Sequence, residues 1–198
     1  MNGNENRGGN PAAQSGGESA AEDGFDGFTG FSPRNPVKTV IVGSTGRMGA
    51  MLLGRARKAG LNVEGVDVPL TPKILAPACA GADLAIICVP AAVFRDVITA
   101  VCPHLSPTAV LADITSVKEI PLQQMEAAWA GPVVGTHPLF GPQPDPEADQ
   151  PVAIVPGTNA GQPHVELASG FFTALGCRVF GSTAEKHDKA MARIQNMN

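Results

Sequence analysis

The sequence predicts an α/β fold in which a doubly wound, mainly parallel sheet carries helices on both faces. Short β-branched and apolar runs alternate with segments whose apolar residues recur at helical spacing. A glycine-rich turn joins the first of these runs to the first helical segment. Parallel strands need crossover connections, so strands that alternate with helices are expected to form a parallel sheet.

The strands are predicted from runs that are apolar enough to be buried on both faces. The first, residues 37–42, is Val-Lys-Thr-Val-Ile-Val, and another, residues 83–89, is stopped by Pro90. The remaining predicted strands are residues 61–67, 109–114, 132–136, 152–155 and 177–180.

Helices are predicted where apolar residues recur three and four positions apart, which places these residues on one face. Gly60 and Gly176 follow the first and the last of these segments, and glycine readily ends a helix. The predicted inner faces consist, in chain order, of Met48, Met51, Leu52, Ala56 and Ala59; Val93, Val97 and Val101; Leu122, Met125 and Trp129; and Ala168, Phe171, Phe172 and Leu175.

Residues 1–36 differ in composition from the rest of the chain and are predicted to form a disordered tail. They are rich in Gly, Asn, Ser, Ala and acidic residues and have no helical or strand period. Such a segment cannot bury enough apolar surface to offset its ordering entropy. Phe25, Phe28 and Phe31 recur three residues apart, so a docking motif for a partner is the alternative.

The composition excludes several classes of function. The chain of 198 residues has a formal net charge of −4, no tyrosine and one tryptophan, so a nucleic-acid-binding surface is not expected. The longest nearly apolar run, residues 84–94, is too short to span a bilayer, and no signal peptide is recognisable. The four cysteines lack CxxC spacing, so neither a metal site nor disulfides are expected. We expect a cytoplasmic protein that acts on a small molecule.

The glycine-rich turn is the predicted cofactor site. It reads Gly43-Ser44-Thr45-Gly46-Arg47-Met48-Gly49 and lies between the first strand and the first helix. Glycines let the backbone approach a pyrophosphate closely, and the helix N-terminus supplies free N–H groups. The spacing departs from G-x-G-x-x-G, because Ser44 occupies the first glycine position when Gly46 and Gly49 are aligned. The turn predicts a Rossmann-like dinucleotide-binding domain, which we expect over residues 37–181.

Asp67 ends the second predicted strand, about 20 residues after the turn, where a carboxylate can accept the hydroxyls of the adenosine ribose. A carboxylate at this position repels a 2′-phosphate, and no Arg or Lys follows before Lys73. NAD is therefore favoured over NADP. The alternative is that Asp67 is a turn residue before Pro69.

Residues 135–142, Gly-Thr-His-Pro-Leu-Phe-Gly-Pro, place His137 at the end of an apolar strand-like run. Pro138 and Pro142 fix φ and remove backbone donors, so the loop is expected to be stiff. A neutral imidazole with an ordinary pKa near 6.5 can take a proton at neutral pH. His137 is therefore the predicted general base, with a pKa expected within about a unit of 6.5. The alternative is a surface turn that happens to contain a histidine.

Five segments, in their order along the chain, resemble the prephenate dehydrogenase family and its arogenate-using relatives. They are residues 43–49, 88–90, 113–118 (Asp-Ile-Thr-Ser-Val-Lys), 135–142, and 185–188 together with 194–195. The Asp-x-x-Ser-x-Lys and His-Pro-x-Phe-Gly-Pro pieces together are specific. The likeness covers residues 37–198, with Leu139 where methionine is commoner.

The resemblance implies an NAD-dependent oxidative decarboxylation of prephenate, or of arogenate, in tyrosine biosynthesis. His137 matches the catalytic histidine of the family, and Ser116 matches the serine that orients the substrate hydroxyl. His187 and Gln195 match positions near the substrate pocket. Val89 and Pro90 match positions beside the cofactor.

Structural alternatives remain for several of these residues. Ser116 and Glu119 have the spacing of a capping box, as do Ser182 and Glu185, so either serine could be a helix N-cap. His187 and Gln195 could equally be interior residues of a helix. For Lys118 we expect a structural role.

The family continues into a helical domain that supplies a dimer interface and an arginine for the substrate carboxylates. Residues 182–198 match the start of that domain, so we expect either a fragment or a reduced relative, and a homodimer only where the domain is present. A non-catalytic or regulatory dinucleotide-binding module is the alternative. Dihydrodipicolinate reductase shares the Gly-Arg-Met-Gly turn but carries paired histidines, and this sequence has no His-His.

Overall fold

The computed structural model describes residue 1, residues 31–32 and residues 35–195. Its helices are α1 (Arg47–Lys58), α2 (Pro72–Cys79), α3 (Ala91–Val101), the 3₁₀ helix η1 (Cys102–His104), α4 (Glu119–Ala128), α5 (Gln162–Ala174) and α6 (Ala184–Gln195). Its strands are β1 (Phe31–Ser32), β2 (Asn35–Pro36), β3 (Thr39–Val42), β4 (Val63–Val66), β5 (Leu84–Ile87), β6 (Val110–Asp113), β7 (Val133–Pro138), β8 (Pro151–Pro156) and β9 (Arg178–Gly181).

The main sheet has seven strands in the order β4-β3-β5-β6-β7-β8-β9. The strands from β4 to β7 are parallel to their neighbours, β8 is antiparallel to β7, and β9 is parallel to β8. The connection between β7 and β8, residues 139–150, contains no helix. The chain therefore turns back directly, and a direct return makes the next strand antiparallel. The predicted doubly wound, mainly parallel sheet is confirmed.

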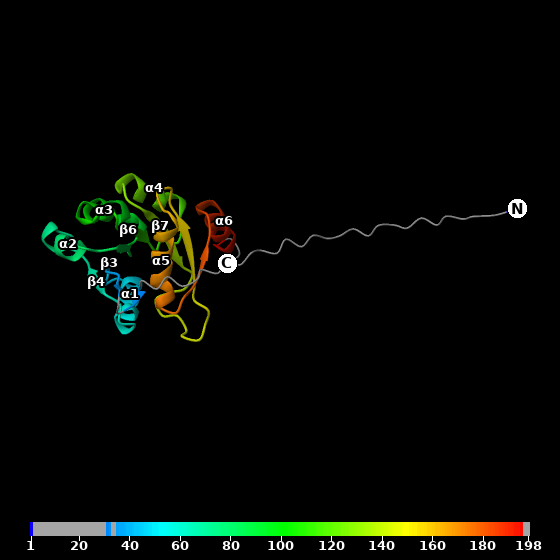
Figure 1. The fold of residues 1–198 in the computed structure, drawn as a ribbon, viewed down its shortest axis with the longest axis horizontal. Helices are drawn as coiled ribbons and strands as arrows, with labels where there is room; N and C mark the ends of the chain where they lie inside the picture. The colour runs from blue at the N-terminus through cyan, green and yellow to red at the C-terminus, as the bar shows by residue number, and fades with distance from the viewer. Residues whose placement is uncertain (2–30, 33–34, 196–198) are drawn as a thin grey trace.

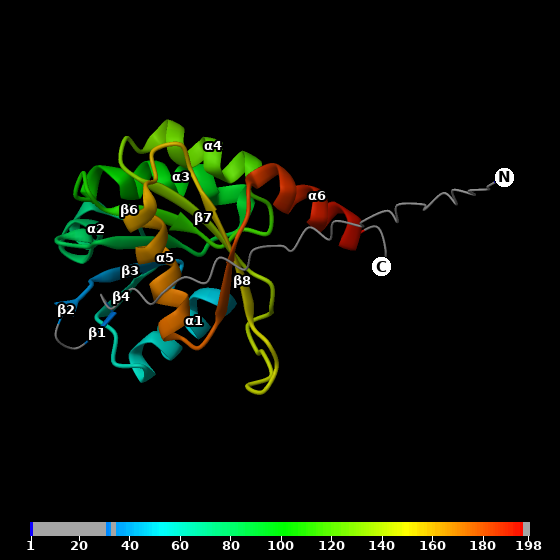
Figure 2. The same cartoon turned by 45° about the vertical axis from the view of Figure 1, so that its right-hand side comes forward.

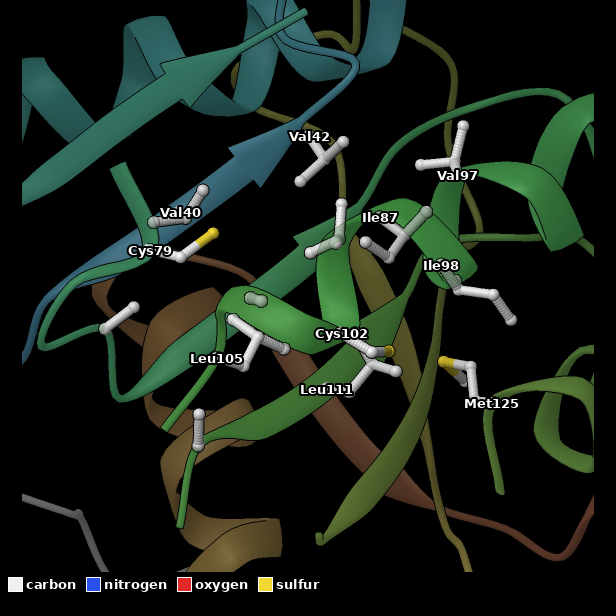
Figure 3. Packing of buried hydrophobic residues seen from close by; sticks show 14 of the residues in the cluster. Val40, Val42, Cys79, Ile87, Val97, Ile98, Cys102, Leu105, Leu111 and Met125 are labelled. Carbon is white, nitrogen blue, oxygen red and sulfur yellow. The ribbon is translucent and has the colours of Figure 1, made fainter. Parts of the chain in front are cut away.

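Helices cover both faces of the sheet, with α2, α3 and α4 on one side and α1 and α5 on the other (Figures 1 and 2). Successive residues of a strand point to opposite faces, so Val42 packs in the cluster under α3, whereas Ile41 packs under α1 and α5. Figure 3 shows the first cluster, which joins Val97 and Ile98 of α3 to Ile87 of β5. Burial on both faces explains why the strand sequences are continuously apolar.

The predicted inner face of α3 was partly wrong. Val97 and Val101 are buried, but Val93 is 45% exposed, and Phe94 and Ile98 complete the buried face instead. The helix begins at Ala91, so positions 94, 97, 98 and 101 follow the i, i+3, i+4, i+7 pattern that faces the sheet.

Two structured segments were not predicted. Helix α2 begins with Pro72 and contains Pro77, and prolines are strong signals against a helix interior. Pro72 nevertheless suits the first helical turn, where no intrahelical N–H bond is needed. Strands β1 and β2 pair with each other inside the expected tail, whereas Phe25 and Phe28 lie outside the described residues.

Candidate active site at the carboxyl edge of the sheet

The strands from β4 to β7 are parallel, so their carboxyl ends meet at one edge of the sheet. The predicted site residues follow these ends: Gly43 after β3, Asp67 after β4, Val89 after β5, Ser116 after β6, and His137 near the end of β7. The strand order reverses beside β3, which neighbours both β4 and β5. Ligands of doubly wound sheets bind at this edge, in the crevice where the order reverses.

The glycine-rich turn is shaped by close backbone contacts. Gly43 has a φ of 86°, and a Cβ there would lie 2.5 Å from the carbonyl oxygen of Cys88. A Cβ at Gly49 would collide with the carbonyl oxygen of Gly43, whereas one at Gly46 would lie 3.3 Å from that oxygen. Gly43, rather than the aligned position Ser44, makes the tight turn, and the nearly buried Ser44 donates its N–H to the carbonyl of Val66.

Asp67 is held beside the glycine-rich turn by Thr45. Its Oδ2 atom accepts the N–H of Thr45 at 2.8 Å and the hydroxyl of Thr45 at 2.7 Å, and its Oδ1 atom accepts the N–H of Val68 at 2.8 Å. Partial burial raises the pKa of Asp67, but these hydrogen bonds outweigh burial and lower the pKa overall. Asp67 is thus an ionised acceptor with lone pairs still available to a ligand.

A cavity of about 350 Å³ lies between the turn and the ends of β4 and β5. The predicted cofactor residues that line it are Gly43, Thr45, Gly46, Asp67, Val89 and Pro90. The rest of its lining is mostly apolar and includes Leu70 and Val97. Of the other predicted cofactor residues, Ser44 lies in the turn, and Arg47 and Met48 lie in the first turn of α1. The first N–H groups of a helix have no intrahelical partners and can bind an anion.

A buried ion pair supports the neighbouring part of the edge. The Nζ atom of Lys118 lies 2.6 Å from Oδ2 of Asp113 and donates to the carbonyl oxygen of Thr136 at 2.6 Å. Gly135 makes room for the lysine, because a Cβ there would lie 3.1 Å from Cδ of Lys118. The expected structural role of Lys118 therefore has a physical basis: the side chain ties β6 to β7 next to His137.

His137 lies within β7 rather than on a loop, and its Cα is paired with that of Ala153 in β8. Its side chain is half-buried. Burial, together with the nearby His187 and Lys118, lowers the pKa of His137 to about 4, against the opposite effect of Asp113 and Asp188. The expected pKa within a unit of 6.5 is thereby corrected, because the pattern of the sequence did not reveal the buried surroundings. At neutral pH the imidazole is uncharged and can accept a proton.

His187 of α6 lies against His137. The Nδ1 atom of His137 and the Nε2 atom of His187 are 2.9 Å apart, and Nδ1 of His187 lies 2.7 Å from Oδ1 of Asp188. Asp188 also accepts the backbone N–H groups of Lys118 and Glu119. Asp188 was not predicted as a site residue, although the Glu-Lys-His-Asp segment contains it.

Neither of the two serines with capping-box spacing caps a helix. Helix α4 begins at Glu119, so Ser116 lies in the preceding loop and is exposed, and the carboxylate of Asp188 caps the helix instead. Helix α6 is capped by the Oγ1 atom of Thr183, which accepts the N–H of Lys186 at 3.2 Å, and not by Ser182. Ser116 is therefore not an N-cap, which removes the structural alternative for this residue.

The remaining predicted residue, Gln195, is the last residue of α6, and its side chain lies outside the described part of the structure. Within the described part, no group of three or more His, Cys, Asp and Glu side chains is arranged to hold a metal ion. The four cysteines are all free and buried. None of the helices formed by the described residues is both long and apolar enough to cross a membrane.

The doubly wound sheet, with a glycine-rich turn and a carboxylate at its switch point, defines a nucleotide-binding α/β domain. The family model "Prephenate dehydrogenase, nucleotide-binding domain" matches residues 47–181. The chain belongs to this family.

Individual relatives agree with this assignment. The T-protein of Enterobacter agglomerans is 36% identical over 159 residues, which cover 79% of this chain and 41% of the T-protein. The crystal structure of Synechocystis arogenate dehydrogenase superimposes with a TM-score of 0.66 at 24% identity, covering 79% of this chain and 63% of that one. Prephenate dehydrogenase from Aquifex aeolicus, solved with hydroxyphenyl propionate and NAD+, gives a TM-score of 0.64 at 19% identity, covering 77% and 62%. The chain thus spans less than two thirds of each relative.

Proposed function

We propose that this chain is the NAD-binding and base-supplying part of a prephenate dehydrogenase. The observation that carries the proposal is the carboxyl edge of the parallel strands, because both the cavity beside Asp67 and His137, near the end of β7, lie at this edge. A dehydrogenase needs a cofactor site and a base side by side, because a hydride and a proton leave the same alcohol.

The residues of the turn fit NAD. The surrounding backbone leaves no room for a side chain at Gly43 or Gly49. Without side chains at these positions, the turn is compact and its backbone can lie close to a pyrophosphate at the start of α1. The ionised carboxylate of Asp67 can accept the two hydroxyls of the adenosine ribose and repels a 2′-phosphate. Bound NAD+ supplies the hydride acceptor.

The reaction balances with His137 as the base. The O–H bond of the substrate hydroxyl breaks, and its proton bonds to the imidazole. The carbon that bears this hydroxyl gives up a hydride to the cofactor and becomes a carbonyl carbon. The bond to the ring carboxylate then breaks, carbon dioxide leaves, and the electron pair of that bond makes the ring aromatic, with the charge on the phenolate oxygen. The proton held by His137 can return to that oxygen, so no net proton is released.

Ser116 and Gln195 complete the proposed substrate site, and His187 supports this site through its contact with His137. The exposed hydroxyl of Ser116 can both donate and accept, which suits a group that orients the substrate hydroxyl toward His137. Prephenate is proposed over arogenate because the family model carries that name, and arogenate is the alternative substrate. We further propose that residues 37–181 form the nucleotide domain and that residues 182–198 begin a helical domain, because Ile194 of α6 is 53% exposed.

Two measurements test the proposal. NADH fluorescence on the 198-residue chain should report saturable binding, and NADPH should bind more weakly. In the gene product that contains this chain, NAD+ and prephenate should yield NADH absorbance, and the rates with arogenate decide between the two substrates. Binding of neither cofactor to the folded chain would refute the cofactor assignment. Binding without turnover of either substrate in the gene product would refute the enzymatic one and favour a regulatory module.

A further inference from the structure

We infer that Asp188 and His187 are positioning residues that fix the tautomer of His137, so that Nε2 of His137 is the atom that takes the substrate's proton. The role in catalysis rests on the proposed function. The tautomer itself depends only on three side chains of this chain and can be measured without substrate.

The three side chains form an unbroken series of hydrogen bonds between α6 and β7. Oδ1 of Asp188 lies 2.7 Å from Nδ1 of His187, and Nε2 of His187 lies 2.9 Å from Nδ1 of His137. The two rings meet edge to face, with centroids 5.1 Å apart and an interplanar angle of 73°. His187 is 4% exposed, so neither of its ring nitrogens can exchange its partner for water without a local opening.

Asp188 is fixed as an acceptor by the N-terminus of α4. Its two oxygens accept the N–H groups of Lys118 at 2.7 Å and of Glu119 at 3.0 Å. Partial burial raises the pKa of Asp188, but the amide of Glu119, the ring of His187 and the amide of Lys118 outweigh it and lower the pKa. The positive end of the helix dipole also favours a carboxylate there. An ionised carboxylate only accepts hydrogen bonds.

The protonation of both rings follows from this acceptor. Because Asp188 cannot donate, Nδ1 of His187 must carry a proton. In the neutral ring, Nε2 of His187 is then an acceptor, so Nδ1 of His137 must carry the proton that the two nitrogens share. The remaining nitrogen of His137, Nε2, keeps its lone pair for the substrate.

The same series stabilises the product of the proton transfer. Once Nε2 of His137 takes a proton, the imidazolium keeps its Nδ1–H bond to His187, and the charge of Asp188 lies at the other end of the series. A carboxylate plays this part toward the histidine of Ser-His-Asp enzymes, where it holds the tautomer without becoming protonated. Both ring nitrogens of His187 have partners, so we assign it an action through His137 rather than direct contact with the substrate.

The first test reads the tautomers directly. The 198-residue chain contains four histidines, so long-range ¹H–¹⁵N spectra of ¹⁵N-histidine protein at pH 7.5 can be assigned with single His→Asn variants. We expect the proton on Nδ1 in both His137 and His187. In His187→Leu, the proton of His137 should move to Nε2, the form that a free imidazole side chain prefers in water. In His187→Gln, the amide oxygen can replace the lost acceptor, so His137 should keep Nδ1–H.

The second test measures catalysis in the gene product that contains this chain. His187→Leu should lower kcat on the order of 10²-fold, with the KM for NAD unchanged, because the base nitrogen is then protonated. His187→Gln should recover most of the loss. If His187 had only a structural role, both variants would lower the rate equally, in proportion to the fraction of protein that no longer folds. If His187→Leu does not fold, Asp188→Asn serves instead. In this variant we expect a mixture of the two tautomers of His137, one protonated on Nδ1 and the other on Nε2.

The outcomes separate this inference from the proposed function. A wild-type His137 protonated on Nε2, a doubly protonated His187 at pH 7.5, or equal kcat values for the Leu and Gln variants would overturn the positioning role. If the tautomers are as inferred but His137→Asn retains full activity, the proposed base is wrong while the hydrogen-bonded series stands.

Discussion

The ammonium group of Lys118 lies 2.6 Å from Oδ2 of Asp113, and both side chains are completely buried. The same carboxylate oxygen accepts the N–H of Thr115, and the lysine also donates to the carbonyl of Thr136. The pair therefore joins the end of β6, the loop that carries Ser116 and the strand that carries His137. It thereby holds together the segments that carry Ser116 and His137.

Breaking this ion pair should be among the most damaging single changes in the chain. Lys118→Met leaves the carboxylate of Asp113 buried without its cation, which costs about 3–5 kcal/mol in comparable cases. The free energy of unfolding from urea titration measures the loss, and the exposed Lys73→Met is the control. The double variant Lys118→Met/Asp113→Asn should recover part of the stability. A loss below about 1 kcal/mol would mean that water reaches the carboxylate.

The second prediction concerns the choice of cofactor. Asp67→Ala removes the negative charge at the ribose site, so the preference for NADH over NADPH should fall. Thr45 then also loses an acceptor, so binding of NADH itself should weaken. Fluorescence titration of both cofactors measures the ratio, with the exposed Glu147→Ala, in the 139–150 loop, as a control of equal charge change. An unchanged ratio of the two affinities would mean that Asp67 stabilises the turn and does not select the cofactor.

The third prediction separates two glycines of the turn. A Cβ at Gly46 would lie 3.3 Å from the carbonyl oxygen of Gly43, which is tight but not a collision, so Gly46→Val should fold. It should bind NADH weakly, because the valine side chain would fill part of the cavity. A Cβ at Gly49 collides with the backbone of Gly43, so Gly49→Ala should lower the thermal stability instead. Calorimetry measures both effects. Normal NADH binding by a folded Gly46→Val protein would contradict the pyrophosphate assignment.

Local patterns in the sequence were enough to predict the sheet, because buried parallel strands must be apolar along their whole length. They also placed the glycine-rich turn and Asp67 directly after strands and His137 near the end of one, while the roles of these residues stay predictions. Helix α2 was missed because Pro77 within it opposes a helix, and its packing against the sheet is not visible in its own segment.

Contacts between distant segments could not be predicted. Asp188 caps α4 from 70 residues away in sequence, so the spacing of Ser116 and Glu119 suggested the wrong cap. The low pKa of His137 likewise depends on burial and on Lys118, neither of which is a property of its own segment. Long-range packing thus decides the electrostatics of the site, while local sequence decides its position.

The fourth prediction follows from that pKa and concerns stability. The unfolded chain binds a proton at His137 below pH 6.5, whereas the folded chain does so only near pH 4. The unfolded state therefore holds more protons between these values, and the contribution of His137 to the free energy of unfolding must fall as the pH drops through this window. In His137→Asn the fall should be smaller, as urea titrations from pH 4 to 7 would measure. Parallel curves for the two proteins would contradict the lowered pKa.

The last prediction concerns catalysis by His137 in the gene product that contains this chain. His137→Asn keeps a hydrogen-bonding side chain on β7 but lacks a basic nitrogen, so kcat should fall on the order of 10² to 10⁴-fold, with the affinity for NAD nearly unchanged. In the wild-type protein the rate should fall only as the pH approaches the lowered pKa of about 4, not near 6.5. His104→Asn, in the 3₁₀ helix η1, is the matched control and should keep full activity. If His137→Asn retains a near-normal kcat and the same acid limb, the base lies elsewhere.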